Sequence, residues 1–140
     1  MIAIIDYGVG NLRSVQKAFE AVGQQAEVTS DKAIIEAASH VVLPGVGAFG
    51  AAAATLRSHG LEDVARAAAL SGRPFLGICV GMQLLFDVSF EYGEHAGLGL
   101  LPGSVVSFDT TNPLAKVPQI GWNAIEWQKD NSLTAAVPSG

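Results

Sequence analysis

PFLGICVGMQLLF, residues 74–86, joins a short apolar run to a segment with helical character. Residues 74–79 read as a strand that is buried on both faces of a parallel sheet, and residues 80–86 as the helix after it. The junction, GICVG (77–81), has the form Gly-x-nucleophile-x-Gly, which is typical of a tight turn that exposes a nucleophile between a strand and a helix. This stretch predicts an α/β fold with a reactive side chain at one edge of the sheet.

On both sides of this stretch, apolar strand-like runs alternate with helical periods and helix-capping signals. We therefore expect one α/β domain over residues 1–140, with an open, mainly parallel sheet and helices on both faces. The expected strands are residues 1–5, 25–29, 40–43 and 74–79, with two more at 104–108 and 123–127. The expected helices are residues 11–22, 30–37, 51–59, 61–72 and 80–86, and residues 110–118 are expected to form a loop.

Cys79 is the only cysteine of the chain, so it cannot form an internal disulfide. A lone cysteine at the end of an apolar strand is often an inert core residue. Here the glycines on both sides and the change from strand to helix favour a nucleophile, because a helix N-terminus stabilises the reactive thiolate. We therefore expect Cys79 to act as a nucleophile.

A cysteine that attacks a carboxamide needs hydrogen-bond donors for the oxyanion of the tetrahedral intermediate. The backbone N–H of Val80, directly after the nucleophile, is one expected donor. PGVG (44–47) follows the strand at 40–43, and open α/β sheets bind ligands at the carboxyl ends of their strands. This segment is the expected source of a second donor, although an ordinary Gly/Pro turn has the same composition.

DYGVGN (6–11) invites a different interpretation, because Gly-x-Gly after a first strand is part of the dinucleotide-binding fingerprint. The third glycine of that fingerprint would be position 13, which is Arg13, and no acidic residue ends the second strand. We interpret the segment as a tight turn into a helix whose polar start faces a partner or the rim of the active site.

The composition argues against several classes of function. The formal net charge is −5, the pI is about 5.0, and the few Lys and Arg residues are scattered, so no basic face for nucleic acid is expected. No apolar stretch reaches the ~20 residues that span a bilayer, and Asp6 interrupts the first apolar run, which argues against a signal peptide. We expect a cytoplasmic protein that binds neither nucleic acid nor membranes.

Five segments together resemble one enzyme family in their order and spacing. GICVGMQ is typical of the class I (triad-type) glutamine amidotransferases, whereas DYGVGNL and VPQIGWN indicate the glutaminase subunits of imidazole glycerol phosphate synthase. The resemblance runs from Met1 to about Trp127. The segments are IIDYGVGNLRSVQKAF (4–19), LPGVGAFG (43–50), GICVGMQLLF (77–86), GLGLLPG (97–103) and KVPQIGWN (116–123).

This resemblance implies an activity, a partner and roles for single residues. Glutamine would be hydrolysed to glutamate and ammonia, and the ammonia would pass through a tunnel to a cyclase subunit, a (β/α)8 barrel, which makes imidazole glycerol phosphate and AICAR in histidine biosynthesis. The two subunits would form a heterodimer, without a cofactor or a metal. The implied site residues are Cys79 as nucleophile, Val80, Val46 and Gly47 in the oxyanion hole, Gln83 and Gly45 at the substrate, and Asn11 and Trp122 in segments that face the partner.

The family's general base and the acid that orients it belong to a His-Pro-Glu segment, which these 140 residues do not contain. The histidines of the chain are His40, His59 and His95, and we expect a structural or surface role for each. The amidotransferase domain is therefore expected to be incomplete at Gly140. A 140-residue chain is expected to show no more than trace glutamine hydrolysis.

Three alternatives stay open at the level of the sequence. A glutaminase of the same class could serve another ammonia-using synthase. A non-catalytic binding or regulatory module could keep the fold and carry an inert thiol at position 79. A redox-sensing protein on a similar scaffold could oxidise Cys79 readily and ignore glutamine.

Overall fold

The computed structural model describes residues 1–109, 111, 117–118, 120–129, 134–135 and 137. The chain divides into two compact units, Met1–Ser107 and Phe108–Gly140, and each unit is described by itself. The single domain expected over residues 1–140 therefore stays a prediction.

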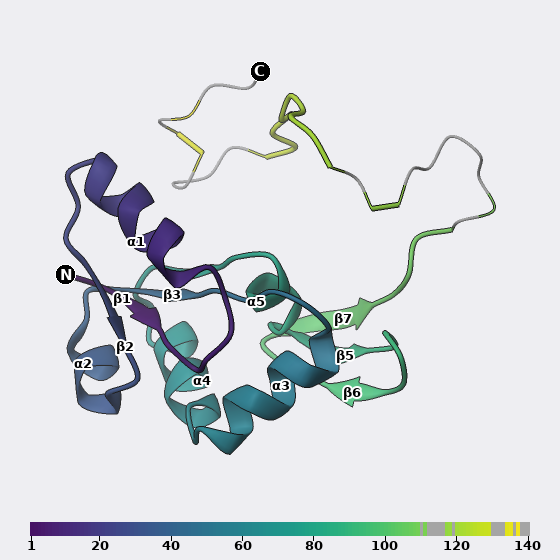
Figure 1. Cartoon of the computed structure of the whole chain (residues 1–140), viewed down its shortest axis with the longest axis horizontal. Coiled ribbons are helices and arrows are strands. Elements are labelled where there is room, and N and C mark those ends of the chain that lie inside the picture. Colours follow the sequence, from purple (N-terminus) through teal and green to yellow (C-terminus); the bar gives the residue numbers. More distant parts are fainter. Residues whose placement is uncertain (110, 112–116, 119, 130–133, 136, 138–140) are drawn as a thin grey trace. The chain divides into compact units, whose positions relative to one another are not determined.

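The first unit is built around a parallel four-stranded sheet with the strand order β2-β1-β3-β4 (Figure 1). In its register, Ile4 of the central strand β1 lies between Val28 and Val42, and Leu43 at the end of β3 pairs with Gly77 at the end of β4. β1 is buried along its whole length, as expected for a parallel strand that is covered on both faces. The strands are β1 (Ile2–Ile5), β2 (Ala26–Thr29), β3 (His40–Leu43) and β4 (Phe75–Gly77).

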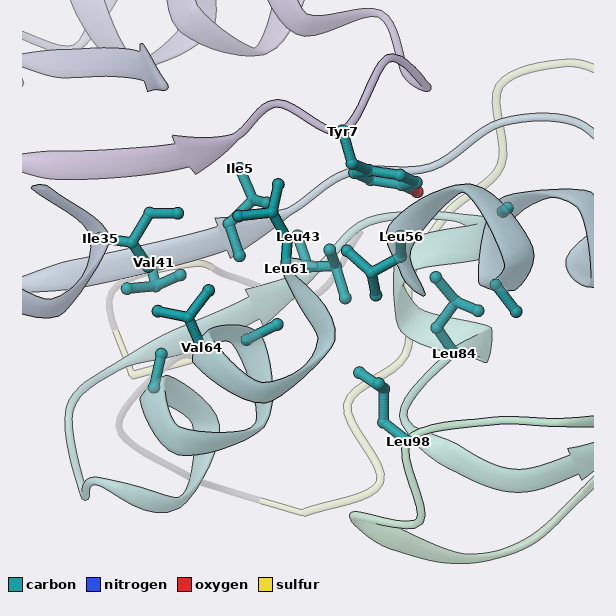
Figure 2. Packing of buried hydrophobic residues seen from close by; sticks show 14 of the residues in the cluster. Ile5, Tyr7, Ile35, Val41, Leu43, Leu56, Leu61, Val64, Leu84 and Leu98 are labelled. Carbon is teal, nitrogen blue, oxygen red and sulfur yellow. The ribbon is translucent and has the colours of Figure 1, made fainter. Parts of the chain in front are cut away.

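Helices cover both faces of this sheet, which confirms the predicted α/β class. α1 packs on one face, where Phe19 lies in a cluster with Ile2 and Ile4. On the other face, Ile5 and Leu43 join the larger cluster with side chains of α2, α3 and α4 (Figures 1 and 2). Alternate residues of β1 thus point to opposite layers. The helices are α1 (Leu12–Ala21), α2 (Lys32–Ala37), α3 (Phe49–Ser58), α4 (Glu62–Leu70) and α5 (Val80–Gln83). Within the described residues, none of them has the length and apolarity to cross a bilayer.

A second, three-stranded sheet follows the short helix α5, and the sequence did not predict it. The helix expected over residues 80–86 ends at Gln83, where the N–H of Leu85 donates to the carbonyl oxygen of Met82 at 3.1 Å in a tighter turn, and the returning chain binds the carbonyls that follow. The N–H groups of Leu98 and Leu100 donate to the carbonyl oxygens of Leu84 and Leu85 at 2.7 and 2.8 Å. The strands are β5 (Phe86–Ser89), β6 (His95–Ala96) and β7 (Leu101–Val105), in the order β6-β5-β7. β7 replaces the strand expected at 104–108.

In the second unit, the described residues include no strand at 123–127, so this prediction was wrong. The indole Nε1–H of Trp127 donates to the carbonyl oxygen of Val137 at 2.8 Å, a contact within the unit. The loop expected at 110–118 lies mostly outside the described residues.

Candidate active site

Cys79 sits at the turn between β4 and α5, in a backbone conformation that residues with a side chain rarely adopt. Its φ is 56° and its ψ is −120°, and α5 begins at the next residue, Val80. A conformation of this kind costs roughly 1–3 kcal/mol and persists only where the surroundings impose it. The thiol is exposed, so the turn presents the sulfur to solvent at the N-terminus of a short helix.

The two glycines of the GICVG turn allow a close approach of backbone to backbone. A Cβ at Gly81 would overlap the carbonyl oxygen of Leu43, and a Cβ at Gly77 would lie 2.7 Å from the Cα of Met82. Neither contact can be relieved by moving a flexible side chain. The strained conformation of Cys79 is therefore imposed by residues within a few positions of it and by the end of β3.

The PGVG segment, residues 44–47, lies against the first turn of α5. Gly45 is buried, and a Cβ on it would be 2.5 Å from the backbone nitrogen of Gly81. Val46 and Gly47 are exposed, and a Cβ on Gly47 would meet no atom within 4 Å. The structure thus brings one end of this segment against the helix that follows Cys79 and leaves its middle open.

The N–H of Val80 is available as an oxyanion donor on general grounds. It is one of the first amides of α5, and such amides have no acceptor inside their own helix. Gln83 stands one turn further on and is half-buried, and its N–H donates to the carbonyl oxygen of Cys79 at 3.1 Å. The thiol of Cys79, the N–H of Val80 and the side chain of Gln83 therefore lie within one short helix and the residue before it.

Tyr7 lies two residues after the end of β1 and also belongs to this region. It was not predicted from the sequence as a site residue. Its side chain is fully buried, and its hydroxyl donates to the carbonyl oxygen of Pro44 at 2.7 Å. Burial and, as the smaller cause, the negative charge of the Cys79 thiolate raise the pKa of Tyr7 to about 12. The phenol consequently stays protonated at neutral pH and keeps its donor. The sequence signal that could have indicated Tyr7 as a site residue was an aromatic residue just beyond the carboxyl end of a central strand.

Glu91 supports the other end of the same segment and was also missed. Its carboxylate accepts the N–H of Phe49, the first residue of α3, at 2.7 Å. The carboxylate thus caps the N-terminus of α3. Ala48, the residue at the N-cap position, has no side chain that could accept this hydrogen bond. Glu91 and Phe49 are 42 positions apart, so no local pattern could have indicated the pair.

The side chains of the three histidines contact residues other than Cys79. The Nδ1 atom of His40 lies 3.0 Å from Ser39 Oγ. The Nδ1 atom of His59 lies 2.9 Å from the carbonyl oxygen of Thr55. The ring of His95 packs against Gly50 at the start of α3, where a Cβ would lie 2.7 Å from it. Within the described part of the chain, none of these rings is hydrogen-bonded to the thiol of Cys79. The described residues also contain no cluster of side chains suited to a metal ion.

The two residues expected to face a partner are both exposed. Asn11 lies at the N-terminal end of α1 and makes no side-chain cap bond there. Trp122 belongs to the second unit and is exposed as fully as in an extended chain. Since the two units are described separately, whether Asn11 and Trp122 share one surface stays a prediction.

Sequence comparison relates the chain to enzymes. The model of the family "Glutamine amidotransferase class-I" matches residues 3–131. The imidazole glycerol phosphate synthase subunit HisH of Rhodopirellula baltica is 51% identical over 140 residues, which are 100% of this chain and 67% of the relative. The HisH subunits of Salinibacter ruber and Lacticaseibacillus casei are 52% and 53% identical, over 95% and 96% of this chain and 63% and 61% of their own lengths. The chain thus spans about two thirds of these relatives.

Structure comparison gives the same fold. A crystal structure titled as a glutamine amidotransferase matches with a TM-score of 0.60 and 24% identity, over 76% of this chain and 56% of that chain. A structure titled as a putative peptidase E protein from Listeria monocytogenes matches with a TM-score of 0.59 and 12% identity, over 71% and 62%. At these identities the two structures support the architecture alone.

Proposed function

Because the chain belongs to the class I glutamine amidotransferases, within the family of the HisH subunits of imidazole glycerol phosphate synthase, we propose that it hydrolyses glutamine to glutamate and ammonia. The observation that carries the proposal is the conformation of Cys79, at φ 56° and ψ −120° on the N-terminus of α5. A turn of this kind has a cost in stability and lifts a nucleophile out of the sheet edge.

In the proposed reaction, the thiolate of Cys79 attacks the carboxamide carbon of glutamine. The C–S bond forms and the C=O electron pair moves to oxygen, where the N–H of Val80 and a peptide group of Val46 or Gly47 stabilise the oxyanion. The oxyanion collapses, the C–N bond breaks, and the nitrogen leaves as ammonia after it takes up a proton. Water then cleaves the glutamyl thioester to glutamate and returns Cys79 to its starting state.

Substrate binding is proposed for the residues around this turn. Gln83 is the last residue of α5 and Gly45 packs against its first turn, and we assign both to contact with the glutamine substrate. The general base is assigned to the His-Pro-Glu segment that the family resemblance implies, because each of His40, His59 and His95 has a structural environment of its own.

The proposed acceptor of the ammonia is a cyclase subunit with a (β/α)8 barrel, so that the pair makes imidazole glycerol phosphate in histidine biosynthesis. The names of the relatives, which are subunits of that synthase, support this partner. Asn11 and Trp122 are the residues that we assign to the interface.

The test is glutamate release by the complete gene product, mixed with the cyclase subunit, for the wild type and for Cys79→Ser. We expect the substitution to lower the rate by about 10³-fold or more, since it removes the nucleophile. A diazo ketone analogue of glutamine should label the peptide that carries Cys79. Equal rates for the two proteins would contradict the proposed chemistry. An unlabelled thiol and no turnover would favour the non-catalytic binding module.

A further inference from the structure

We propose that Tyr7 is a positioning residue of this site, which holds the carbonyl of Pro44 and so sets the PGVG segment in the position that oxyanion binding requires. The inference rests on the proposed glutaminase chemistry and adds to it a residue on another strand. Tyr7 itself touches neither the substrate nor the reacting atoms in this assignment.

The side chain of Tyr7 is held in place by burial and by the hydrogen bonds of the turn that carries it. Tyr7 follows the fully buried strand β1, and its own side chain is fully buried in the main core cluster (Figure 2). The turn that carries it is fixed by two hydrogen bonds, from the N–H of Asp6 to the carbonyl oxygen of Thr29 at 2.9 Å and from the N–H of Gly8 to Asp6 Oδ1 at 3.0 Å. The hydroxyl therefore has little freedom to move.

The bond from this hydroxyl to Pro44 controls the first peptide of the segment. The Pro44 carbonyl and the Gly45 N–H belong to one planar peptide group and point in opposite directions. When Tyr7 holds the carbonyl at 2.7 Å, the direction of the Gly45 N–H is fixed as well. The exposed residues Val46 and Gly47 therefore follow a peptide group whose orientation is fixed.

Gly45 connects this anchor to the nucleophile turn. A Cβ on Gly45 would lie 3.0 Å from the hydroxyl oxygen of Tyr7, 2.5 Å from the nitrogen of Gly81 and 3.0 Å from the carbonyl carbon of Val80. The hydroxyl, the segment and the first turn of α5 are thus packed together without space for a side chain. This packing places the ends of β1, β3 and β4 in one unit around the site.

Burial is the main cause of the raised pKa of Tyr7, and a negative charge on Cys79 is the smaller one, so the hydroxyl keeps its proton. The phenol hydroxyl donates a hydrogen bond to the carbonyl oxygen of Pro44. We therefore assign it a role in holding the backbone and none in proton transfer. Removal of the hydroxyl should release one end of the PGVG segment, while Glu91 still holds the other end through Phe49.

The experiment compares Tyr7→Phe with Tyr92→Phe in the complete gene product, assayed with the cyclase subunit well below the Tm of each variant. Tyr92 is the other tyrosine of the chain and is 90% exposed, so it is a matched control. We expect kcat of Tyr7→Phe to fall about 10-fold or more with KM for glutamine nearly unchanged, because an oxyanion contact acts in the transition state. Tyr92→Phe should match the wild type.

A second measurement separates positioning from a general loss of structure. The γ-aldehyde of glutamate adds to the Cys79 thiol, and the resulting thiohemiacetal places its oxygen where the oxyanion forms. We expect its inhibition constant to rise in Tyr7→Phe by the same factor as kcat falls. An unchanged kcat, or a lower kcat with an unchanged inhibition constant for the aldehyde, would overturn the inference. A wild type without turnover would instead contradict the proposed function.

If Tyr7→Phe does not fold, 3-fluorotyrosine is incorporated at position 7 alone, by suppression of a stop codon placed there in the gene. Fluorine makes the phenol more acidic and leaves its shape nearly unchanged. We expect the alkaline loss of kcat to move to lower pH, because the donor to Pro44 is lost earlier. An unmoved pH profile would overturn the inference.

Discussion

The GICVG turn and the PGVG segment lie at the same edge of the first sheet, but they are held in different ways. The turn is fixed by its own glycines and by Leu43, through backbone contacts that admit no side chain. The PGVG segment is held at its two ends by side chains from elsewhere, Tyr7 at 37 positions and Glu91 at 42 positions along the chain. Both therefore depend on the assembled fold, but the turn depends on the backbone of the neighbouring strand β3, whereas the segment depends on two single side chains.

The largest expected effect is on catalysis and separates the function of the turn from its stability. Cys79→Gly should lower glutamate release by about 10⁴-fold, because it removes the nucleophile. The same change should stabilise the fold by about 1 kcal/mol, since glycine adopts a φ of 56° without strain. Turnover and the free energy of unfolding are measured on the same preparations. A destabilised Cys79→Gly variant would show that the turn is not strained.

The next effect tests whether the two glycine regions differ as described. Gly81→Ala should destabilise the fold by more than about 3 kcal/mol, because its Cβ would overlap the backbone of Leu43. Gly47→Ala is the matched control. It meets no neighbouring atom and has only the strain of its φ of +80°, so about 1 kcal/mol is expected. Thermal unfolding gives both values, and equal losses would remove the distinction.

Alkaline pH provides a test of the anchor at the start of the PGVG segment. The pKa of Tyr7 is raised to about 12, so between pH 10 and that value the folded state binds more protons than the unfolded state. The stabilisation is complete below pH 10, and the free energy of unfolding should fall by roughly 1.4 kcal/mol per pH unit above it. Urea unfolding of the wild type and of Tyr7→Phe isolates this term. Identical pH dependence in the two proteins would argue against the buried phenol.

The smallest expected effect concerns the other end of the segment. Glu91→Gln weakens the charged cap on Phe49 and should destabilise α3 by about 1 kcal/mol. Hydrogen exchange of the Phe49 amide should accelerate accordingly. Glu94→Gln, in the same hairpin but exposed, is the control and should change neither quantity. If both variants behave alike, the cap is not significant for this end.

Much of the first unit could be predicted from the sequence, because its strands and helices are signalled locally. The four parallel strands and the helices between them follow from apolar runs and helical periods. The family that was inferred from five short segments is confirmed by the family match over residues 3–131. These features depend on neighbours in the sequence, which a single chain displays directly.

The errors occur where distant contacts decide the outcome. VGMQLLF has a helical pattern, yet the helix ends at Gln83, and the carbonyls of Leu84 and Leu85 accept N–H groups of the distant residues Leu98 and Leu100. β5 and β6 were missed for the same reason. Tyr7 and Glu91 were missed as site residues, since their partners Pro44 and Phe49 are remote in sequence. The roles assigned to Cys79 and its neighbours remain predictions until they are tested by substitution.

The contacts of the PGVG segment also have a consequence for synthesis on the ribosome. The glycine contacts of the GICVG turn lie between the end of β3 and Met82, so all of these residues are present once Met82 has been translated. The far end of the segment needs Glu91, which is translated later. We therefore expect the nascent chain to carry all the residues of the GICVG turn before the second anchor of the PGVG segment is available.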